Sequence, residues 1–136
     1  MTFKEKKIFL SRYIYAENAI KASVEEYQRW EAIGTKVNQM FSDAPRFGSD
    51  VSSKVEQAAI EMASILDGIK AEIDDAKRIK AEVIAAINKV PKLRQRELLR
   101  YRYVCRMSNA KIAEVLGKDV RTIERAMRTA IFKFDP

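Results

Sequence analysis

The chain has 136 residues, 47% hydrophobic and 33% charged, a composition that excludes a disordered or collagen-like protein. A single cysteine and no histidine exclude an intrachain disulfide and argue against zinc sites and histidine-based catalysis, so we expect no enzyme, no cofactor and no metal. The net charge of +7 is uneven, because residues 1–88 hold 13 Lys and Arg against 14 Asp and Glu, whereas residues 89–136 hold 13 against 5, which predicts a polyanion-binding C-terminal part.

The pattern of residues predicts an all-α protein. Only four Gly and three Pro are present, and no segment alternates apolar and polar residues as a strand does. No run approaches the roughly 20 apolar residues of a membrane span, and the first residues lack an apolar signal segment. We therefore expect a cytoplasmic protein that does not contact a membrane.

Two long helices are predicted before the basic part. The first carries an aromatic stripe at spacings of three and four, and Ser42 to Asp50 has the composition of a loop. The second carries a heptad seam with one polar interruption at Lys80, which we interpret as a lysine that extends to solvent rather than one that fixes register. The stripe comprises Phe9, Tyr13, Ala16, Ile20, Val24, Tyr27, Trp30 and Val37, and the seam Val55, Ala59, Met62, Leu66, Ile69, Ile73, Ala76, Val83, Ile87 and Val90.

These helices are expected to form a long antiparallel, coiled-coil-like hairpin over residues 1–90. A lone hairpin leaves apolar residues outside the seam in water, among them Ile33, Ile65, Ile79 and Ile84. We therefore predict a homodimer formed through the hairpin. The alternative is that the basic domain folds back and covers these residues within one chain.

Residues 91–136 are predicted to form a three-helix domain with a C-terminal helix-turn-helix. Pro91 ends the long helix, and a helix over residues 94–106 follows. Ser108 can cap a short helix that Gly117 ends, and Asp119 can cap a third helix beginning near Val120. Apolar, small and turn residues then fall at helix-turn-helix spacing, at Ile112, Ala113, Leu116, Gly117, Ile123 and Ala126.

The C-terminal part resembles region 4 of sigma-70-type factors, which reads the −35 promoter element. The resemblance rests on residues 96–103, on Ser108 to Gly117, and on Thr122-Ile123-Glu124-Arg125 through Ala130. As a whole, the chain is similar to small regulators of phages and integrated elements of Gram-positive bacteria, including the ArpU-type late-gene regulators. No segment resembling sigma region 2 precedes the motif, so we do not expect self-sufficient promoter opening.

Two residues depart from the pattern of region 4. Arg106 stands where that region usually has a turn glycine, and Lys111 stands where a glutamate usually opens the Glu-Ile-Ala run. These two departures imply that the loop before the motif differs from that of region 4 and that the first helix of the motif is more basic.

The third helix is predicted to enter the major groove of duplex DNA. Its early positions suit base edges, because arginine donates to guanine, glutamate accepts from cytosine and valine contacts the thymine methyl. The base-reading candidates are Val120, Arg121, Glu124 and Arg125, which also match the promoter-reading positions of region 4. The phosphate-binding candidates are Lys111, Lys118, Arg128, Thr129 and Lys133. Alternatively, Arg125 or Arg128 pairs with Glu124 or with an acidic residue elsewhere, as on an ordinary surface helix.

The sequence thus predicts a sequence-specific DNA-binding transcriptional regulator. Two other functions stay open: an adaptor that binds host RNA polymerase, and a small terminase-like subunit for DNA packaging. Small terminase subunits usually place the DNA-binding part first and form rings of many subunits, whereas here the basic part comes last.

Overall fold

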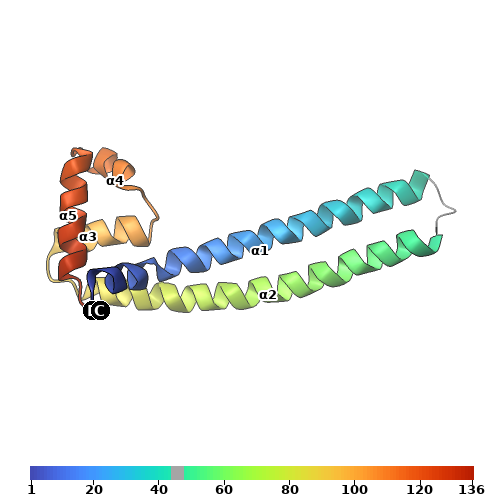
Figure 1. Cartoon of the computed structure of the whole chain (residues 1–136), viewed down its shortest axis with the longest axis horizontal. Helices are drawn as coiled ribbons and strands as arrows, with labels where there is room; N and C mark the ends of the chain where they lie inside the picture. Colours follow the sequence, from blue (N-terminus) through green and yellow to red (C-terminus); the bar gives the residue numbers. More distant parts are fainter. Residues whose placement is uncertain (44–47) are drawn as a thin grey trace. The chain divides into compact units, whose positions relative to one another are not determined.

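The computed structural model describes residues 1–43 and 48–136, with side chains described for residues 1–36 and 53–136. These residues form five helices and no strand (Figure 1), which confirms the all-α class, with a helical hairpin followed by three shorter helices. None of the described helices is long and apolar enough to cross a membrane. The helices are α1 (Phe3–Asp43), α2 (Gly48–Asn88), α3 (Leu93–Tyr103), α4 (Asn109–Leu116) and α5 (Val120–Lys133).

The predicted loop between the long helices is shorter in the structure. Helix α1 continues through Ser42 and Asp43, and α2 begins at Gly48, so only residues 44–47, which lie outside the described residues, separate the two helices. Ser, Asp and Gly favour the first and last turns of helices as well as loops, so composition alone could not place the boundary.

The described chain divides into two compact units. The first, which we call the head unit, combines residues 1–17 with residues 75–136, and the second, the hairpin unit, comprises residues 18–74. The head unit carries 20 Lys and Arg against 9 Asp and Glu, a net charge of +11, whereas the hairpin unit carries 6 against 10, a net charge of −4. The first turns of α1 therefore add to the positive charge of the C-terminal helices.

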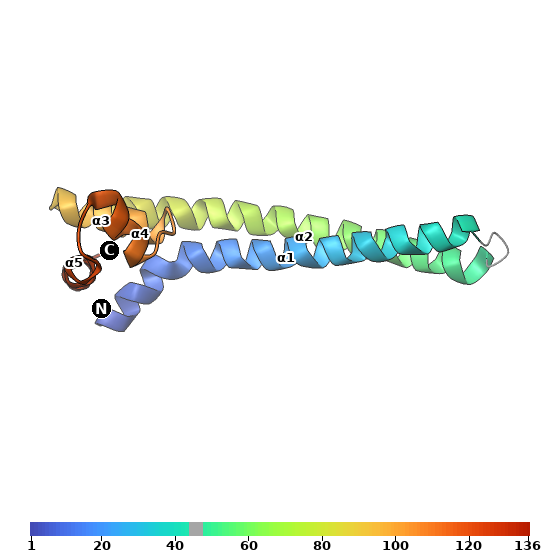
Figure 2. The same ribbon diagram turned by 90° about the horizontal axis from the view of Figure 1, so that it is seen from above.

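In the hairpin unit, α1 and α2 run side by side and antiparallel (Figures 1 and 2). The Ser23 hydroxyl donates a hydrogen bond of 2.7 Å to Glu72, and further along α1 Gly34 lies against Ala58. Because the partner on α2 moves backwards as α1 advances, the contacts define the antiparallel direction. The predicted aromatic stripe, as far as its side chains are described, is half-buried along this line.

The heptad seam of α2 separates into two columns in the hairpin unit. Val55, Met62 and Ile69 are buried or half-buried, whereas Leu66 is 41% exposed and Ile73 is 37% exposed. Ala59 is exposed in the same column as these two. Ile65, expected outside the seam, is half-buried. A 3.5-residue repeat places two columns on one helix face, and a single partner helix here covers only one of them.

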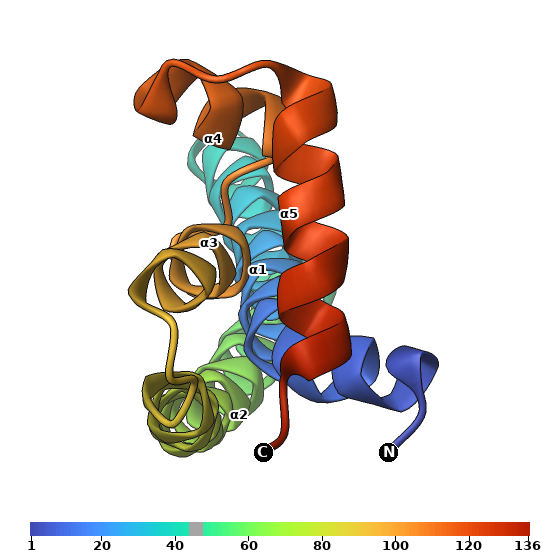
Figure 3. The ribbon, with the colours of Figure 1, turned by 90° about the vertical axis from the view of Figure 1, so that its left-hand side faces the viewer.

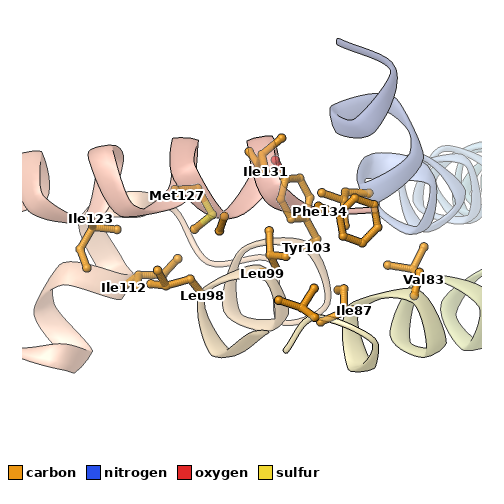
Figure 4. Packing of buried hydrophobic residues seen from close by; sticks show 14 of the residues in the cluster. Val83, Ile87, Leu98, Leu99, Tyr103, Ile112, Ile123, Met127, Ile131 and Phe134 are labelled. Carbon is orange, nitrogen blue, oxygen red and sulfur yellow. The ribbon is translucent and has the colours of Figure 1, made fainter. Parts of the chain in front are cut away.

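The head unit is built around the buried side of α5. This helix lies beside α3 and α4 (Figure 3). Ile123, Met127 and Ile131 share its buried face, because apolar residues at spacings of three and four lie on one side of a helix, and Figure 4 shows these side chains in the core. They pack against Leu98 and Leu99 of α3, both almost fully buried. Burying each such side chain contributes about 1.5–3 kcal/mol of transfer free energy.

The same core includes the bases of both long helices. Leu10 of α1 and Val83 and Ile87 of α2 are fully buried together with Phe134, which follows α5. The Phe9 ring lies 5.9 Å from the Phe134 ring, centroid to centroid. The helix-turn-helix therefore shares one hydrophobic core with the start of α1 and the end of α2.

Candidate nucleic-acid interface

The turn between α4 and α5 has the geometry predicted from Gly117. This glycine adopts a left-handed conformation with φ of 63°, and its amide donates to the Glu114 carbonyl at 3.3 Å. The following amide, of Lys118, donates to the Ala113 carbonyl at 2.9 Å, which completes a Schellman cap. The turn thus redirects the chain between the two helices of the motif within three residues, Gly117 to Asp119.

Both helices of the motif are capped at their N-termini by the predicted side chains. Ser108 accepts a hydrogen bond from the Lys111 amide at 3.1 Å, and Asp119 accepts one from the Arg121 amide at 3.4 Å. Each cap satisfies a backbone donor that has no partner inside its helix. The starting points of α4 and α5 are therefore fixed by local interactions.

The packing predicted for the helix-turn-helix is present. Ile112, Ala113 and Ile123 are buried, and Leu116 and Ala126 pack against the same core while remaining partly exposed. These contacts hold α4 against α5 and leave the opposite side of α5 in solvent.

A stripe of charged residues occupies that exposed side of α5. Arg121, Glu124, Arg125 and Arg128 line one polar groove along the helix. Within the described residues none of the three arginines forms an ion pair, so the alternative in which they pair with acidic neighbours is not observed. Val120 is exposed in the first turn. The four base-reading candidates therefore lie at the N-terminal half of one helix, with Arg128 beside them.

The phosphate-binding candidates are more dispersed. Lys111 forms an ion pair of 3.5 Å with Glu114 on the surface of α4, and Lys118 lies in the turn. Thr129 donates from its hydroxyl to the Arg125 carbonyl at 3.1 Å, and Lys133 ends α5. The structure places Arg128, assigned from the sequence to phosphate, in the groove of the base-reading candidates.

A second groove borders the first and includes residues that the sequence did not single out. It is lined by Lys7 of α1, Arg102 of α3 and Asn109 of α4, and Glu124 and Arg128 line it as well as the first groove. Arg102 could have been identified from the sequence, because it lies in the basic C-terminal segment. Lys7 could not have been identified in this way, because it precedes the motif by about a hundred residues and only the fold brings it to the groove.

The loop between α3 and α4 is tied to α1 by a charged network. Arg106 adopts a left-handed conformation with φ of 59°, at the position where the resemblance placed a glycine, and its guanidinium contacts Glu17 at 2.7 Å. Glu17 also accepts a short hydrogen bond from Tyr13. Lys80 is exposed to solvent, in line with the interpretation of this seam position, and its ammonium lies 5.5 Å from the centre of the Tyr13 ring.

This network shifts the pKa values of its members. The hydrogen bond to Glu17, together with burial, raises the pKa of Tyr13 to about 12. Burial acts to raise the pKa of Glu17, but hydrogen bonds from Tyr13 and Arg106 outweigh it and hold that pKa below its ordinary value of 4.5. Glu17 is thus ionised and Tyr13 is neutral at neutral pH. In the core nearby, burial raises the pKa of Tyr103.

Part of the chain is similar to a known protein family. Residues 80–131 match the family model described as "Sigma-70, region 4", which covers less than half of the chain. No curated protein and no solved structure matches the chain. The matched segment starts within α2 and ends within α5, so it takes in the end of the long helix as well as the motif. Residues 80–131 are therefore similar to sigma-70 region 4, and within them α4 and α5 form a helix-turn-helix.

Proposed function

We propose that the protein is a sequence-specific duplex-DNA-binding transcriptional regulator of the type encoded by phages and integrated elements, including the ArpU-type regulators, and that it acts in the cytoplasm. The observation that carries this proposal is the arginine stripe on α5, which makes no ion pair among the described residues. The stripe lies in residues 80–131, the segment that matches sigma-70 region 4, and in a unit with a net charge of +11. In this proposal residues 91–136 bind DNA and residues 1–90 form the oligomer, while part of the hairpin supports the core of the DNA-binding part.

In the proposed complex, the N-terminal half of α5 enters the major groove. Arg121 and Arg125 donate to guanine edges, Glu124 accepts from a cytosine amino group, and Val120 contacts a thymine methyl. Phosphates flanking the groove are bound by the basic side chains around it and by the Thr129 hydroxyl, which turns from the Arg125 carbonyl to donate to the phosphate. These cations are Lys111, Lys118, Arg128 and Lys133.

A second copy of the chain is the proposed partner of the hairpin. The exposed column of Ala59, Leu66 and Ile73 repeats every seven residues on α2, which is the spacing at which one helix packs lengthwise on another. Two copies related by a twofold axis would cover this column isologously and would present two α5 helices to a pseudo-palindromic site.

An electrophoretic mobility shift with the intact chain and duplex DNA, without and with host RNA polymerase, tests the proposed function. We expect a shift without polymerase, weakening steeply as salt is raised because bound cations release counterions from DNA. A shift that requires polymerase would instead favour the adaptor function. The absence of a shift both without and with polymerase would contradict the DNA-binding function and the adaptor function.

A further inference from the structure

The groove between α1, α3, α4 and α5 has the composition of an anion site. Lys7, Arg102 and Arg128 reach it from three different helices, against one carboxylate, that of Glu124. Its volume of about 280 Å³ is several times the roughly 30 Å³ that a water molecule occupies in the liquid, so a hydrated phosphate group fits.

The cations of the groove differ in how firmly they are held. Arg102 donates to the Met107 carbonyl at 3.2 Å and lies over the Tyr103 ring, which fixes the guanidinium while leaving it further N–H donors. Lys7 is exposed, and within the described residues its ammonium makes no ion pair. An anion in the groove would thus meet one positioned guanidinium and one solvent-exposed ammonium.

The first turn of α4 adds to the groove. Asn109 is the first residue of α4, where backbone amides lack helical partners and the helix dipole favours negative charge. The side-chain oxygen of Asn109 is buried and has no hydrogen-bond partner among the described residues.

The position of the groove identifies the anion. Glu124 and Arg128 line this groove and the groove of the base-reading candidates, so a duplex on α5 passes beside it. When a recognition helix enters the major groove, the preceding helix of the motif crosses the DNA backbone. The chemical group expected at the N-terminus of α4 is therefore a backbone phosphate.

We propose that this groove binds a phosphate of the duplex that α5 reads, and that Lys7 makes the N-terminal turns of α1 part of the DNA interface. This inference rests on the proposed function and deepens it. It extends the interface from the C-terminal helix-turn-helix to a residue at the opposite end of the sequence.

The test compares Lys7→Gln with Lys77→Gln in the intact chain. Lys77 is an exposed lysine of α2 in the same head unit and lines neither of these two grooves, so its substitution removes the same charge without altering the proposed site. Fluorescence anisotropy with a short random-sequence duplex, over a series of salt concentrations, measures affinity and its salt dependence.

Because Lys7→Gln removes one phosphate contact, its affinity for the duplex should be roughly three- to tenfold lower than that of the wild type. The slope of the logarithm of affinity against the logarithm of salt concentration should fall in magnitude by about one. Lys77→Gln should match the wild type, and Lys7→Arg should restore affinity. Equal affinities and slopes for Lys7→Gln and Lys77→Gln would overturn the inference and leave the proposed function intact. A wild-type chain that binds no duplex would overturn both.

Discussion

Two residues in left-handed conformation bracket α4, and they tolerate this backbone geometry for different reasons. Gly117, with φ of 63°, has no Cβ, and a Cβ placed there would meet no atom within 4 Å. Arg106, with φ of 59°, carries the steric cost of about 1–2 kcal/mol that left-handed geometry imposes on a side chain. Its ion pair with Glu17 gives this arginine a role in the fold that a turn glycine could not have.

At the residue scale we predict that the same substitution has opposite effects at two glycines. Gly117→Ala should lower the free energy of unfolding by about 1 kcal/mol, because only the backbone is strained. Gly68→Ala, inside α2 with nothing within 4 Å of the new Cβ, should raise it by about 0.5–1 kcal/mol through helix propensity. Urea unfolding of both variants checks this, and a loss of stability in both would contradict the account.

Local sequence signals were sufficient to predict the roles of the residues that cap and terminate the helices of the motif. Ser108, Gly117 and Asp119 act on backbone groups within four residues, so the sequence predicted their roles and the structure confirms them. The positive φ of Arg106 and the placement of Lys7 depend on contacts with segments about 90 to 100 residues away. No pattern within one element could reveal them.

At the element scale, α1 contributes to both structural units along its length. Its first turns join the head unit, where Lys6 donates to the Phe132 carbonyl at 2.6 Å and Leu10 is fully buried. From Asn18 onward it belongs to the hairpin unit. Periodicity predicted the helix and its stripe, but it could not show which part of the stripe faces a second helix and which part faces α5, because both use the same spacing.

The link between α1 and the α3–α4 loop should depend on pH through Glu17. Because its folded pKa lies below 4.5, its contribution to stability is present above that pH and is lost as the pH falls through the depressed value. Wild type should exceed Glu17→Gln in unfolding free energy at pH 7 by less than about 1 kcal/mol, since the pair is partly solvated. Urea unfolding between pH 7 and pH 3 measures this difference, and a constant difference across that range would contradict it.

At the scale of the whole molecule, the two units differ in net charge as the proposed DNA-binding and oligomerisation functions require. The head unit carries +11 and the hairpin unit carries −4, which favours binding of a polyanion by the head unit rather than by the hairpin unit. The sequence located most of this charge in residues 89–136. It could not assign the lysines near the N-terminus to the same unit, because only the fold joins the two ends of the chain.

We predict that the exposed column of α2 is covered by a second chain. In sedimentation at micromolar concentration, the wild type should have the mass of two chains. Leu66→Glu should yield folded monomers, because Leu66 is already 41% exposed within one chain and burying its charge against a partner is costly. Ala71→Glu, at an exposed position outside the column, should leave the dimer intact. A monomeric wild type would contradict the prediction.

The most direct test of the central claim is the sequence preference of the intact chain for duplex DNA. Duplexes selected from a random library without polymerase should share a preferred sequence. On that sequence, Arg121→Ala and Arg125→Ala should each lose about 1–3 kcal/mol of binding free energy, with little loss on a scrambled duplex, whereas Lys118→Ala should weaken both duplexes alike. Absence of any enriched sequence, or equal losses on both duplexes for all three variants, would contradict base reading by α5.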